Sequence, residues 1–422
     1  MGNDQLSRRN FMKTSASVIA LTAMSSKNIF AAGDEKIKIG LIGAGGRGTG
    51  AAINCLEASP DVEIVAMCDL FKDRVDGSLN RLKKDFADRV KVTPETTFTG
   101  FDGAQKVLDS GIDMVILACP PGFRPRHLEM AVNAGKHVFM EKPVATDPAG
   151  IRKVIAASKL AETKKLSIVA GTQRRHQKHY IDIIRQVEAG VIGEPVAGQC
   201  FWNGGELWHR GKEASWTEME YQCRNWLYFT WLSGDHIVEQ HVHNIDVCNW
   251  AMGGHPVKAY GMGGRQKRTD PKWGNIWDHF AIEFEYENGA KVMSMCRQSS
   301  GCSNRVSEYI VGTKGRIATN GSNGQILIDG KKTNFDGSPN PYVQEHKDLV
   351  ASIKGGQYLN EGVRVAESTM TAILGRMSAY TGREIKFDWA LNASKLELVP
   401  QNPVLGDLEE RPVAIPGITK MI

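Results

Sequence analysis

Lys142 is the residue whose type and position most clearly suit chemistry. It lies in Glu141-Lys142-Pro143, directly after the apolar run 137–140, which is typical of a short buried strand. The proline favours an extended backbone at Lys142, which would direct the ammonium group across a cleft toward a substrate oxygen. Alone, the turn could equally be a solvated Glu-Lys pair, but its place at the end of a strand favours the chemical role.

A second group of candidates lies in the stretch 234–246, which contains three histidines and three acidic residues. If this stretch is helical, Glu239, His243 and Asp246 share one face, with His236, while His241 points away. A carboxylate one turn from a histidine can set its tautomer and raise its basicity, as a general base requires. A core helix with satisfied polar groups, or a metal site of His236, Glu239 and His243, are the alternatives. We favour the general base and assign no metal ligand.

A glycine loop follows the first apolar run of the chain. Residues 43–48 read Gly-Ala-Gly-Gly-Arg-Gly, between strand-like residues 37–42 and helix-compatible residues 49–57. Such glycines let backbone N–H groups and a helix N-terminus approach a pyrophosphate. The loop therefore predicts dinucleotide contacts from Gly43, Gly45, Gly46, Arg47 and Gly48.

Asp69 indicates which dinucleotide would bind. It ends the second strand-like run and lies about 20 positions after the last loop glycine, as a ribose-binding carboxylate does. Its charge would repel a 2′-phosphate, which favours NAD over NADP, whereas Arg47 and Lys72 could attract one. Pro120 and Glu141, at the ends of two further strands, complete the predicted cofactor contacts.

Aromatic residues are concentrated in one part of the chain. Six of the nine tryptophans lie between positions 201 and 250. Flat aromatic faces suit the C–H surfaces of sugars, although an aromatic core would look the same. We predict substrate contacts from Arg174, Trp226, Tyr228 and Asp246.

The elements that position these residues divide the chain. Strands alternating with helices over 33–174 predict a doubly wound parallel sheet, a Rossmann dinucleotide-binding domain. Over 175–388 the strands come as hairpins, such as 280–286 and 291–295 joined through Asn288-Gly289, which predicts an α/β domain with a largely antiparallel open sheet. Residues 389–422, interrupted by four prolines, are predicted to extend as an arm over their own domain or a neighbouring subunit.

Residues 1–32 are predicted to be a targeting segment. Ser7-Arg8-Arg9-Asn10-Phe11-Met12-Lys13 is a twin-arginine pattern, and the apolar run 15–24 is too short for a membrane span. We expect export by the twin-arginine route to the periplasm or outside the cell. The net charge is only +5, mostly from this segment, so we predict neither a nucleic-acid partner nor membrane insertion. The eight cysteines show no metal spacing and are expected to be buried thiols.

Together the glycine loop, Gly135-Lys136-His137-Val138 leading into Glu141-Lys142-Pro143, and the stretch through His243 and Asp246 resemble the Gfo/Idh/MocA oxidoreductases. The resemblance spans about residues 37–387. It implies the two domains predicted above, and an open sheet that often forms subunit contacts, hence a homo-oligomer. It also implies catalytic roles for Lys142, Glu239 and His243, although the family usually has Asp in place of Glu239.

The resemblance implies an NAD-dependent oxidoreductase that acts on a secondary hydroxyl of a sugar or glycoside with tightly bound cofactor. His243 would take the hydroxyl proton, Lys142 would stabilise the oxyanion, and Glu239 would orient His243 or a sugar hydroxyl. An alternative is an NAD-dependent glycosidase working through transient oxidation, elimination and re-reduction, with His241 or His236 as the leaving-group acid. An alternative outside the enzymes is a non-catalytic sugar-binding protein with a relic cofactor fold.

Overall fold

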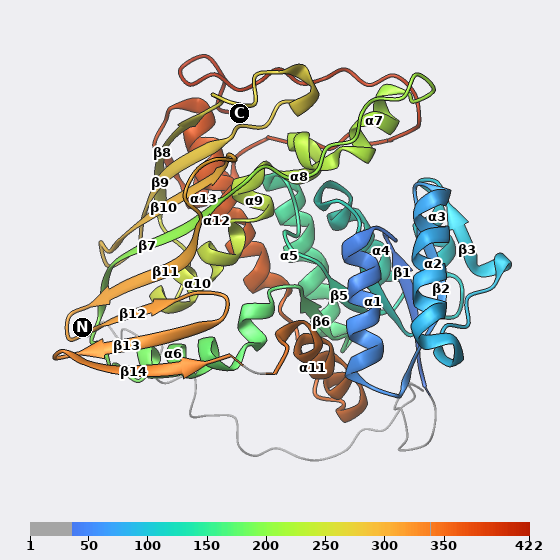
Figure 1. Cartoon of the computed structure of the whole chain (residues 1–422), viewed down its shortest axis with the longest axis horizontal. Helices are drawn as coiled ribbons and strands as arrows, with labels where there is room; N and C mark the ends of the chain where they lie inside the picture. The colour runs from blue at the N-terminus through green and yellow to red at the C-terminus, as the bar shows by residue number, and fades with distance from the viewer. Residues whose placement is uncertain (1–35, 338) are drawn as a thin grey trace, which may run out of the picture. The chain divides into compact units, whose positions relative to one another are not determined.

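The first part of the chain folds into a six-stranded parallel sheet, as its alternating strands and helices predicted (Figure 1). The computed structural model describes residues 36–337 and 339–422, so the predicted export signal lies outside the described residues. The strands are β1 (Ile37–Ile42), β2 (Val62–Asp69), β3 (Thr97–Thr99), β4 (Met114–Leu117), β5 (His137–Met140) and β6 (Ile168–Ala170). Their order is β3-β2-β1-β4-β5-β6, which puts the reversal of the chain, where such folds bind ligands, between β1 and β4.

Five helices connect these strands: α1 (Gly46–Ala58), α2 (Lys72–Phe86), α3 (Gly103–Leu108), α4 (Arg124–Asn133) and α5 (Pro148–Thr163). The start of α5 is the one that the sequence predicted, with Pro148 in the first turn and Asp147 as the N-cap. The Asp147 carboxylate accepts a hydrogen bond from the Gly150 backbone N–H at 2.7 Å. This cap begins α5 a few residues after Lys142 and so limits the length of the turn that carries the lysine.

The second part forms a nine-stranded sheet in the order β14-β13-β12-β11-β7-β10-β9-β8-β15. Its pairings are antiparallel except between β7 and β10, and the predicted hairpin through Asn288-Gly289 is β9–β10. The strands are β7 (Pro195–Gly204), β8 (Lys258–Gly264), β9 (His279–Glu285), β10 (Lys291–Gln298), β11 (Arg305–Gly312), β12 (Arg316–Thr319), β13 (Asn323–Ile328), β14 (Lys331–Asp336) and β15 (Ile385–Lys386). The predicted fold class, a Rossmann sheet followed by a largely antiparallel sheet, is therefore confirmed.

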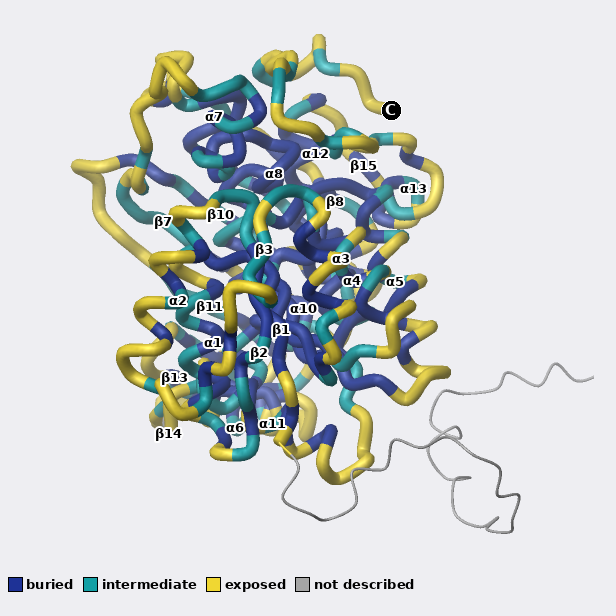
Figure 2. Tube along the Cα trace, turned by 90° about the vertical axis from the view of Figure 1, so that its right-hand side faces the viewer, coloured by how far each residue is buried: buried dark blue, intermediate teal, exposed yellow. Residues whose placement is uncertain are grey.

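The second part of the chain also contains helices. They are α6 (Lys178–Glu188), α7 (Glu218–Arg224), α8 (Thr230–Ser233), α9 (His236–Glu239), α10 (Val242–Met252), α11 (Pro341–Gly355), α12 (Gly362–Thr381) and α13 (Phe387–Asn392). Figure 1 shows α10 and α12 beside the nine-stranded sheet, and α12 also packs against α5 of the first part. In Figure 2, α8 and α10 are coloured as buried, and so are most residues of β1. Helix α10 shares its hydrophobic cluster with β1, whereas α8 packs in a second cluster with α7.

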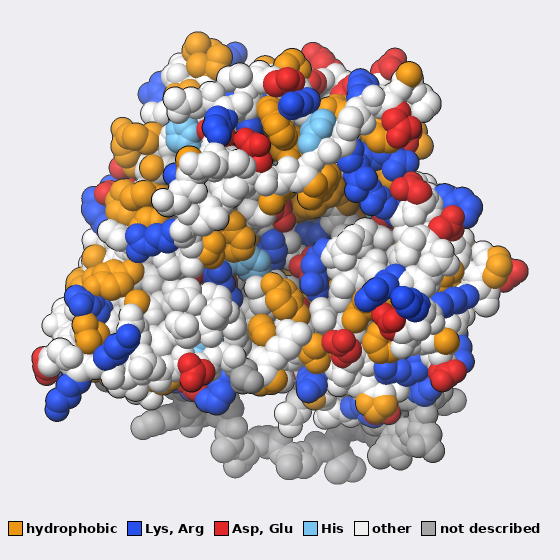
Figure 3. Space-filling model, in the orientation of Figure 1, with side chains coloured by type: hydrophobic (Ala, Val, Ile, Leu, Met, Phe, Trp, Pro, Cys, Tyr) orange, Lys and Arg blue, Asp and Glu red, His pale blue; other side chains and the backbone are white. Residues whose placement is uncertain are grey.

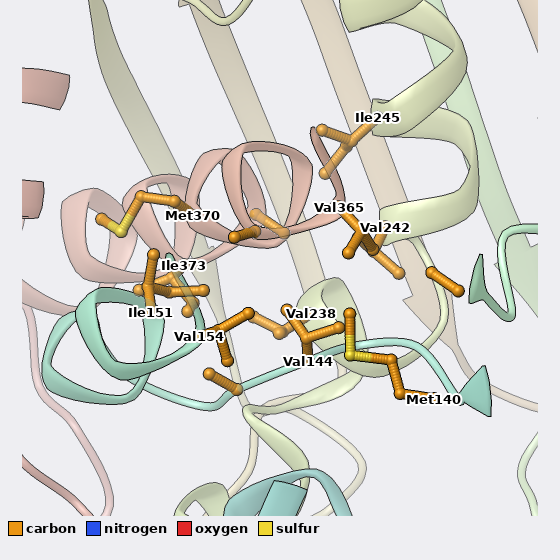
Figure 4. Packing of buried hydrophobic residues seen from close by; sticks show 14 of the residues in the cluster. Met140, Val144, Ile151, Val154, Val238, Val242, Ile245, Val365, Met370 and Ile373 are labelled. Carbon is orange, nitrogen blue, oxygen red and sulfur yellow. The ribbon is translucent and has the colours of Figure 1, made fainter. Parts of the chain in front are cut away.

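One hydrophobic cluster joins the two parts (Figure 4). Met140 and Val144, which flank the Glu-Lys-Pro turn, pack in the same cluster as Val238 and Val242 from α9 and α10. These side chains are fully buried. Because each flanks a polar candidate residue, their packing brings Lys142 toward the segment that carries Glu239 and His243.

Late segments of the chain return to the parallel sheet. Asn360 forms a parallel bridge with Ile168 at the edge of β6, and α11 packs against α1. The first sheet is thus completed by residues far outside the alternating pattern that predicted it.

The C-terminal arm lies on its own chain. The Leu398 N–H donates to the Asp147 carboxylate at 2.7 Å, and the Trp277 indole N–H donates to the Ala414 carbonyl at 3.2 Å. The sequence left two positions open for this arm, over its own domain or over a neighbouring subunit, and these contacts are of the first kind.

None of the helices in the described ranges has the length and hydropathy of a membrane span. All eight cysteines lie in these ranges; none is disulfide-bonded, and all except Cys302 are buried.

Candidate active site

A cavity of about 460 Å³ opens where β1, β2 and β4 end. This volume lies within the range of about 300–1,000 Å³ typical of small-molecule sites. Figure 3 shows the hollow between the two parts of the molecule, with charged and histidine side chains inside it. Six predicted cofactor residues line the cavity: Gly43, Gly45, Gly46, Arg47, Asp69 and Pro120.

The glycine loop has the close backbone contacts that its sequence requires. Gly43 has a φ of +97°, which favours glycine, and a Cβ on Gly48 would lie 1.8 Å from the Gly43 carbonyl oxygen. Gly48 is therefore needed for packing inside the loop and does not itself line the cavity. Around Gly45 and Gly46 a Cβ would meet nothing within 4 Å, and no side chain caps the start of α1. The loop thus leaves room, and backbone donors, for an anionic group.

Asp69 ends β2 at the rim of the same cavity. Its carboxylate accepts hydrogen bonds from the backbone N–H groups of Ala44, at 2.8 Å, and Phe71, at 3.1 Å. Burial raises the pKa of Asp69, although these two hydrogen bonds oppose the shift. A carboxylate has about four acceptor positions, so two remain for ribose hydroxyls. Loop, cavity and carboxylate together fit a nicotinamide dinucleotide.

Arg47 links the glycine loop to the Glu-Lys-Pro turn. Its Nε donates to Glu141 Oε1 at 2.7 Å, and its guanidinium carbon lies 5.2 Å from the centroid of the Tyr342 ring. Glu141 is buried and is absent from the cavity lining. Glu141 thus holds Arg47 beside the loop, and its predicted contact with the cofactor stays a prediction.

Lys142 and Glu239 lie in contact, a pairing that the sequence did not predict. Lys142 Nζ donates to the Glu239 backbone carbonyl at 2.7 Å and lies 3.4 Å from the Glu239 carboxylate. Both side chains are 13% exposed, so they are enclosed but reachable.

The sequence predicted one continuous helix from Glu239 to Asp246, and this prediction is wrong. Helix α9 ends at Glu239 and α10 begins at Val242. In one helix the Glu239 carbonyl would accept from the His243 N–H. Here the Glu239 carbonyl accepts a hydrogen bond from Lys142 Nζ, and the His243 N–H donates to the Gln240 carbonyl instead, at 3.3 Å. The Glu239 side chain consequently faces Lys142, and it forms no hydrogen bond with His243 in the described structure.

His243 begins α10 beside an aromatic wall. Its ring lies 5.8 Å from the Trp202 ring, with 22° between the planes. Burial, and then the positive charges of Lys142, Arg174 and Arg47, hold the pKa of His243 well below its usual value. The ring is therefore neutral, and the low pKa makes it a weaker base than an ordinary histidine. Its Nδ1 is buried without a hydrogen-bond partner among the described residues.

Asp246 and Arg174 are buried in ion pairs and do not line the dinucleotide cavity, which counts against their predicted substrate contacts. Asp246 is 1% exposed, and its carboxylate pairs with Arg175 at 2.8 Å and accepts from the Ser368 hydroxyl at 2.7 Å. Arg174 is buried with its guanidinium on Glu308. Both charges are neutralised inside the protein, which a charge in the interior requires.

The two aromatic substrate predictions have different outcomes. Tyr228 is fully buried, and its hydroxyl donates to the backbone carbonyls of Leu207 and Trp208, so it is corrected to a core residue. Trp226 lines the dinucleotide cavity, whose lining includes Asp69 and does not include Lys142. Its surroundings are therefore those of a cofactor and not of a substrate.

His236 and His241, the two other histidines of the stretch, are fully buried. His241 Nε2 lies 2.8 Å from the Ser294 hydroxyl, whereas neither ring nitrogen of His236 has a hydrogen-bond partner among the described residues. In residues 36–337 and 339–422 no three His, Cys, Asp or Glu side chains are placed to hold a metal ion.

Trp202 is a candidate that sequence reasoning did not single out. It lies on β7 two residues after Cys200, whose buried side chain faces His241. Strand alternation therefore puts Trp202 on the same face of the sheet, toward α10. The alternation of side chains along β7 was the sequence signal that could have identified Trp202.

Family models match both parts of the chain. Residues 37–171 match a model described as an oxidoreductase family with an NAD-binding Rossmann fold. Residues 180–318 match the GFO/IDH/MocA C-terminal domain.

Curated relatives include inositol dehydrogenases. Over 298 residues the chain is 26% identical to inositol 2-dehydrogenase of Rubrobacter xylanophilus, covering 70% of this chain and 75% of that protein. Over 219 residues it is 25% identical to inositol 2-dehydrogenase of Salmonella typhimurium, covering 51% of this chain and 54% of that protein. The matched region thus spans between about half and three quarters of these relatives.

Solved structures share the fold. A levoglucosan dehydrogenase in complex with NADH and levoglucosan superposes with a TM-score of 0.68 at 14% identity, covering 84% of this chain and 100% of that chain. The aldose-aldose oxidoreductase of Caulobacter crescentus, complexed with glycerol, has a TM-score of 0.66 at 18% identity, covering 83% of this chain and 100% of that chain.

Proposed function

We propose that this chain, which belongs to the Gfo/Idh/MocA family of oxidoreductases, oxidises a secondary hydroxyl of a sugar, glycoside or cyclic polyol with NAD as its cofactor. The contact between Lys142 and Glu239 carries the proposal, because it lies beside His243 where β5 ends. The relatives named as inositol dehydrogenases, and the structure named for levoglucosan, support a polyhydroxylated substrate.

Each of the three side chains has a separate role in the proposed reaction. His243 is neutral and would accept the hydroxyl proton, although its low pKa makes the free ring a weaker base than an ordinary histidine. Lys142, held by Glu239, stabilises the negative charge that develops on the substrate oxygen. A bound nicotinamide would supply the acceptor for the hydride. Glu239 fixes the position of Lys142, in place of the contact with His243 that the sequence suggested.

Asp69 supports NAD over NADP. Of the two basic residues that the sequence suggested for a 2′-phosphate, Arg47 pairs with Glu141, and Lys72 pairs with Asp76 at 2.7 Å on the exposed side of α2. The Asp69 carboxylate lines the cavity and would repel a 2′-phosphate there, although the basic side chains of Arg47, Arg74 and Arg210 line it too.

Net oxidation is favoured over glycoside cleavage. Cleavage through transient oxidation needs an acid for the leaving group, and His236 and His241 were the candidates. Both are fully buried and cannot reach a leaving group. A non-catalytic sugar-binding protein is disfavoured because it would have no need of a lysine held beside a neutral histidine.

We further propose that the protein is exported through the twin-arginine route with its cofactor already bound. The support is the pattern at 7–13, since this route carries folded proteins. A homo-oligomer is proposed on the family resemblance alone.

The test is a panel of sugars, glycosides and cyclic polyols incubated with the purified protein and NAD or NADP, with reduced cofactor followed by absorbance. We expect NADH formation with at least one member, and none from the His243→Ala variant. Sustained release of an aglycone without accumulated NADH would support the glycosidase instead. Sugar binding with no reduction of either cofactor would contradict both enzymatic proposals.

A further inference from the structure

The second part of the chain supplies one wall of the dinucleotide cavity. Residues 205–228, which we call the outer wall, lie between β7 and α8 and place Trp208, Arg210 and Trp226 along the cavity. These side chains line the same cavity as Leu70 and Phe71, which follow Asp69 in the chain. Because a carboxylate in the position of Asp69 binds the adenosine ribose, the outer wall lies at the adenosine end of the site.

Arg224 joins the outer wall to the first part of the chain. Its Nη2 donates to Asp73 Oδ1 at 3.1 Å, and its guanidinium carbon lies 3.9 Å from the centroid of the Phe71 ring. Its Nε donates to Glu220 at 2.9 Å, within the outer wall itself. The Arg224 side chain is only 14% exposed. One guanidinium therefore connects the wall to both the end of β2 and the first turn of α2.

This contact is not part of the strand–turn–helix motif. The motif binds a dinucleotide from one side, through the loop, the helix N-terminus and Asp69. Arg224 and Asp73 are 151 positions apart in the sequence. The wall of the site opposite the motif is therefore held in place by a contact between the two parts of the chain.

We propose that Arg224 is a positioning residue that holds the outer wall over the adenosine end of a bound nicotinamide dinucleotide. Release of the nucleotide then requires the contacts of Arg224 with Asp73 and Phe71 to open. The inference rests on the proposed function, because it takes the cofactor from it. It supplies a physical reason for a nucleotide that stays bound through export.

The test measures nucleotide exchange in the full chain. Purified protein is mixed with excess NADH, and energy transfer from tryptophan to the reduced nicotinamide reports the rate at which the resident nucleotide is replaced. Arg224→Met removes the ion pair and the charge over Phe71. Asp73→Asn removes the ion pair with Arg224, together with a longer one to Arg74 at 3.6 Å, and keeps the charge over Phe71. The Asp73 side chain is 56% exposed, so the substitution leaves the core intact.

Matched controls lie on the same helix. Arg81→Met and Asp76→Asn each remove an exposed ion pair of α2 that does not line the cavity. Both should exchange nucleotide within about twofold of wild type, because exposed ion pairs contribute little.

We expect exchange to be about tenfold faster in Arg224→Met, which corresponds to ~1.4 kcal/mol. An ion pair and a cation over a ring together are of that order. Asp73→Asn should give a smaller increase, and the double variant should be no faster than Arg224→Met, because both changes remove one contact. If Arg224→Met does not fold, Asp73→Asn alone decides. Exchange at the wild-type rate in both variants would overturn the inference and leave the proposed function standing. Failure of the wild type to bind NADH would overturn both.

Discussion

Replacing Asp246 by Asn should destabilise the protein without changing its affinity for substrate. The Asp246 carboxylate is buried against the Arg175 guanidinium, with Nε to Oδ2 at 2.8 Å and Nη2 to Oδ1 at 2.9 Å. Burial alone would raise its pKa, but the charges of Arg175 and Arg364 and the hydrogen bonds outweigh burial and lower it from 3.8 to about 2. A shift of nearly two units corresponds to about 2–3 kcal/mol, at ~1.36 kcal/mol per unit.

The direction of the Asp246 pKa shift sets the pH range over which Asp246→Asn destabilises the protein. A depressed carboxyl pKa stabilises the fold above the unfolded pKa, near 4, and this contribution is lost as pH falls toward about 2. The free-energy difference between wild type and Asp246→Asn should therefore be constant from about pH 8 to pH 5 and shrink below about pH 4. Urea denaturation at a series of pH values measures it.

A matched control separates this buried pair from an exposed one. Asp76→Asn removes the ion pair between Lys72 and Asp76 on the surface of α2, and should cost no more than about 0.5 kcal/mol. If Asp246→Asn costs as little as this control but raises the KM for substrate, the reasoning is refuted. Asp246 would then be the substrate contact that its sequence position suggested.

Three further substitutions test the site. Lys142→Met should lower turnover on the order of 100-fold or more while NADH still binds, by tryptophan fluorescence; near-normal turnover would remove Lys142 from the mechanism. Gly48→Ala puts a Cβ 1.8 Å from the Gly43 carbonyl oxygen and should weaken NADH binding about tenfold or more, whereas Gly77→Ala, with nothing within 4 Å, should not. Trp202→Ala should raise the KM for substrate and leave the Kd for NADH unchanged, because Trp202 lies against His243 and outside the lining of the dinucleotide cavity; an equal loss of both affinities would contradict this assignment.

The sequence by itself determined the dinucleotide site, because that site is local. Gly43, Gly48 and Asp69 belong to one strand–helix–strand unit, whose backbone geometry depends on neighbours in the chain. A glycine is required at Gly48 wherever such a loop forms, and the carboxylate follows from the end of the next strand. The same holds for the Asp147 cap, whose hydrogen bond spans three residues. Hairpins such as β9–β10 were predictable for the same reason.

The tertiary structure alone decided the partners of the buried charges. Lys142 and Glu239 are 97 positions apart, and Arg175 and Asp246 are 71 apart, so no local pattern pairs them. A helical wheel put Glu239 beside His243, but Lys142 takes the Glu239 carbonyl and the helix breaks there. An ionised side chain in the interior must be neutralised by whichever opposite charge the packing brings within reach. Which charges pair depends on how the two sheets and the helices pack, and the periodicity of the sequence does not predict that packing.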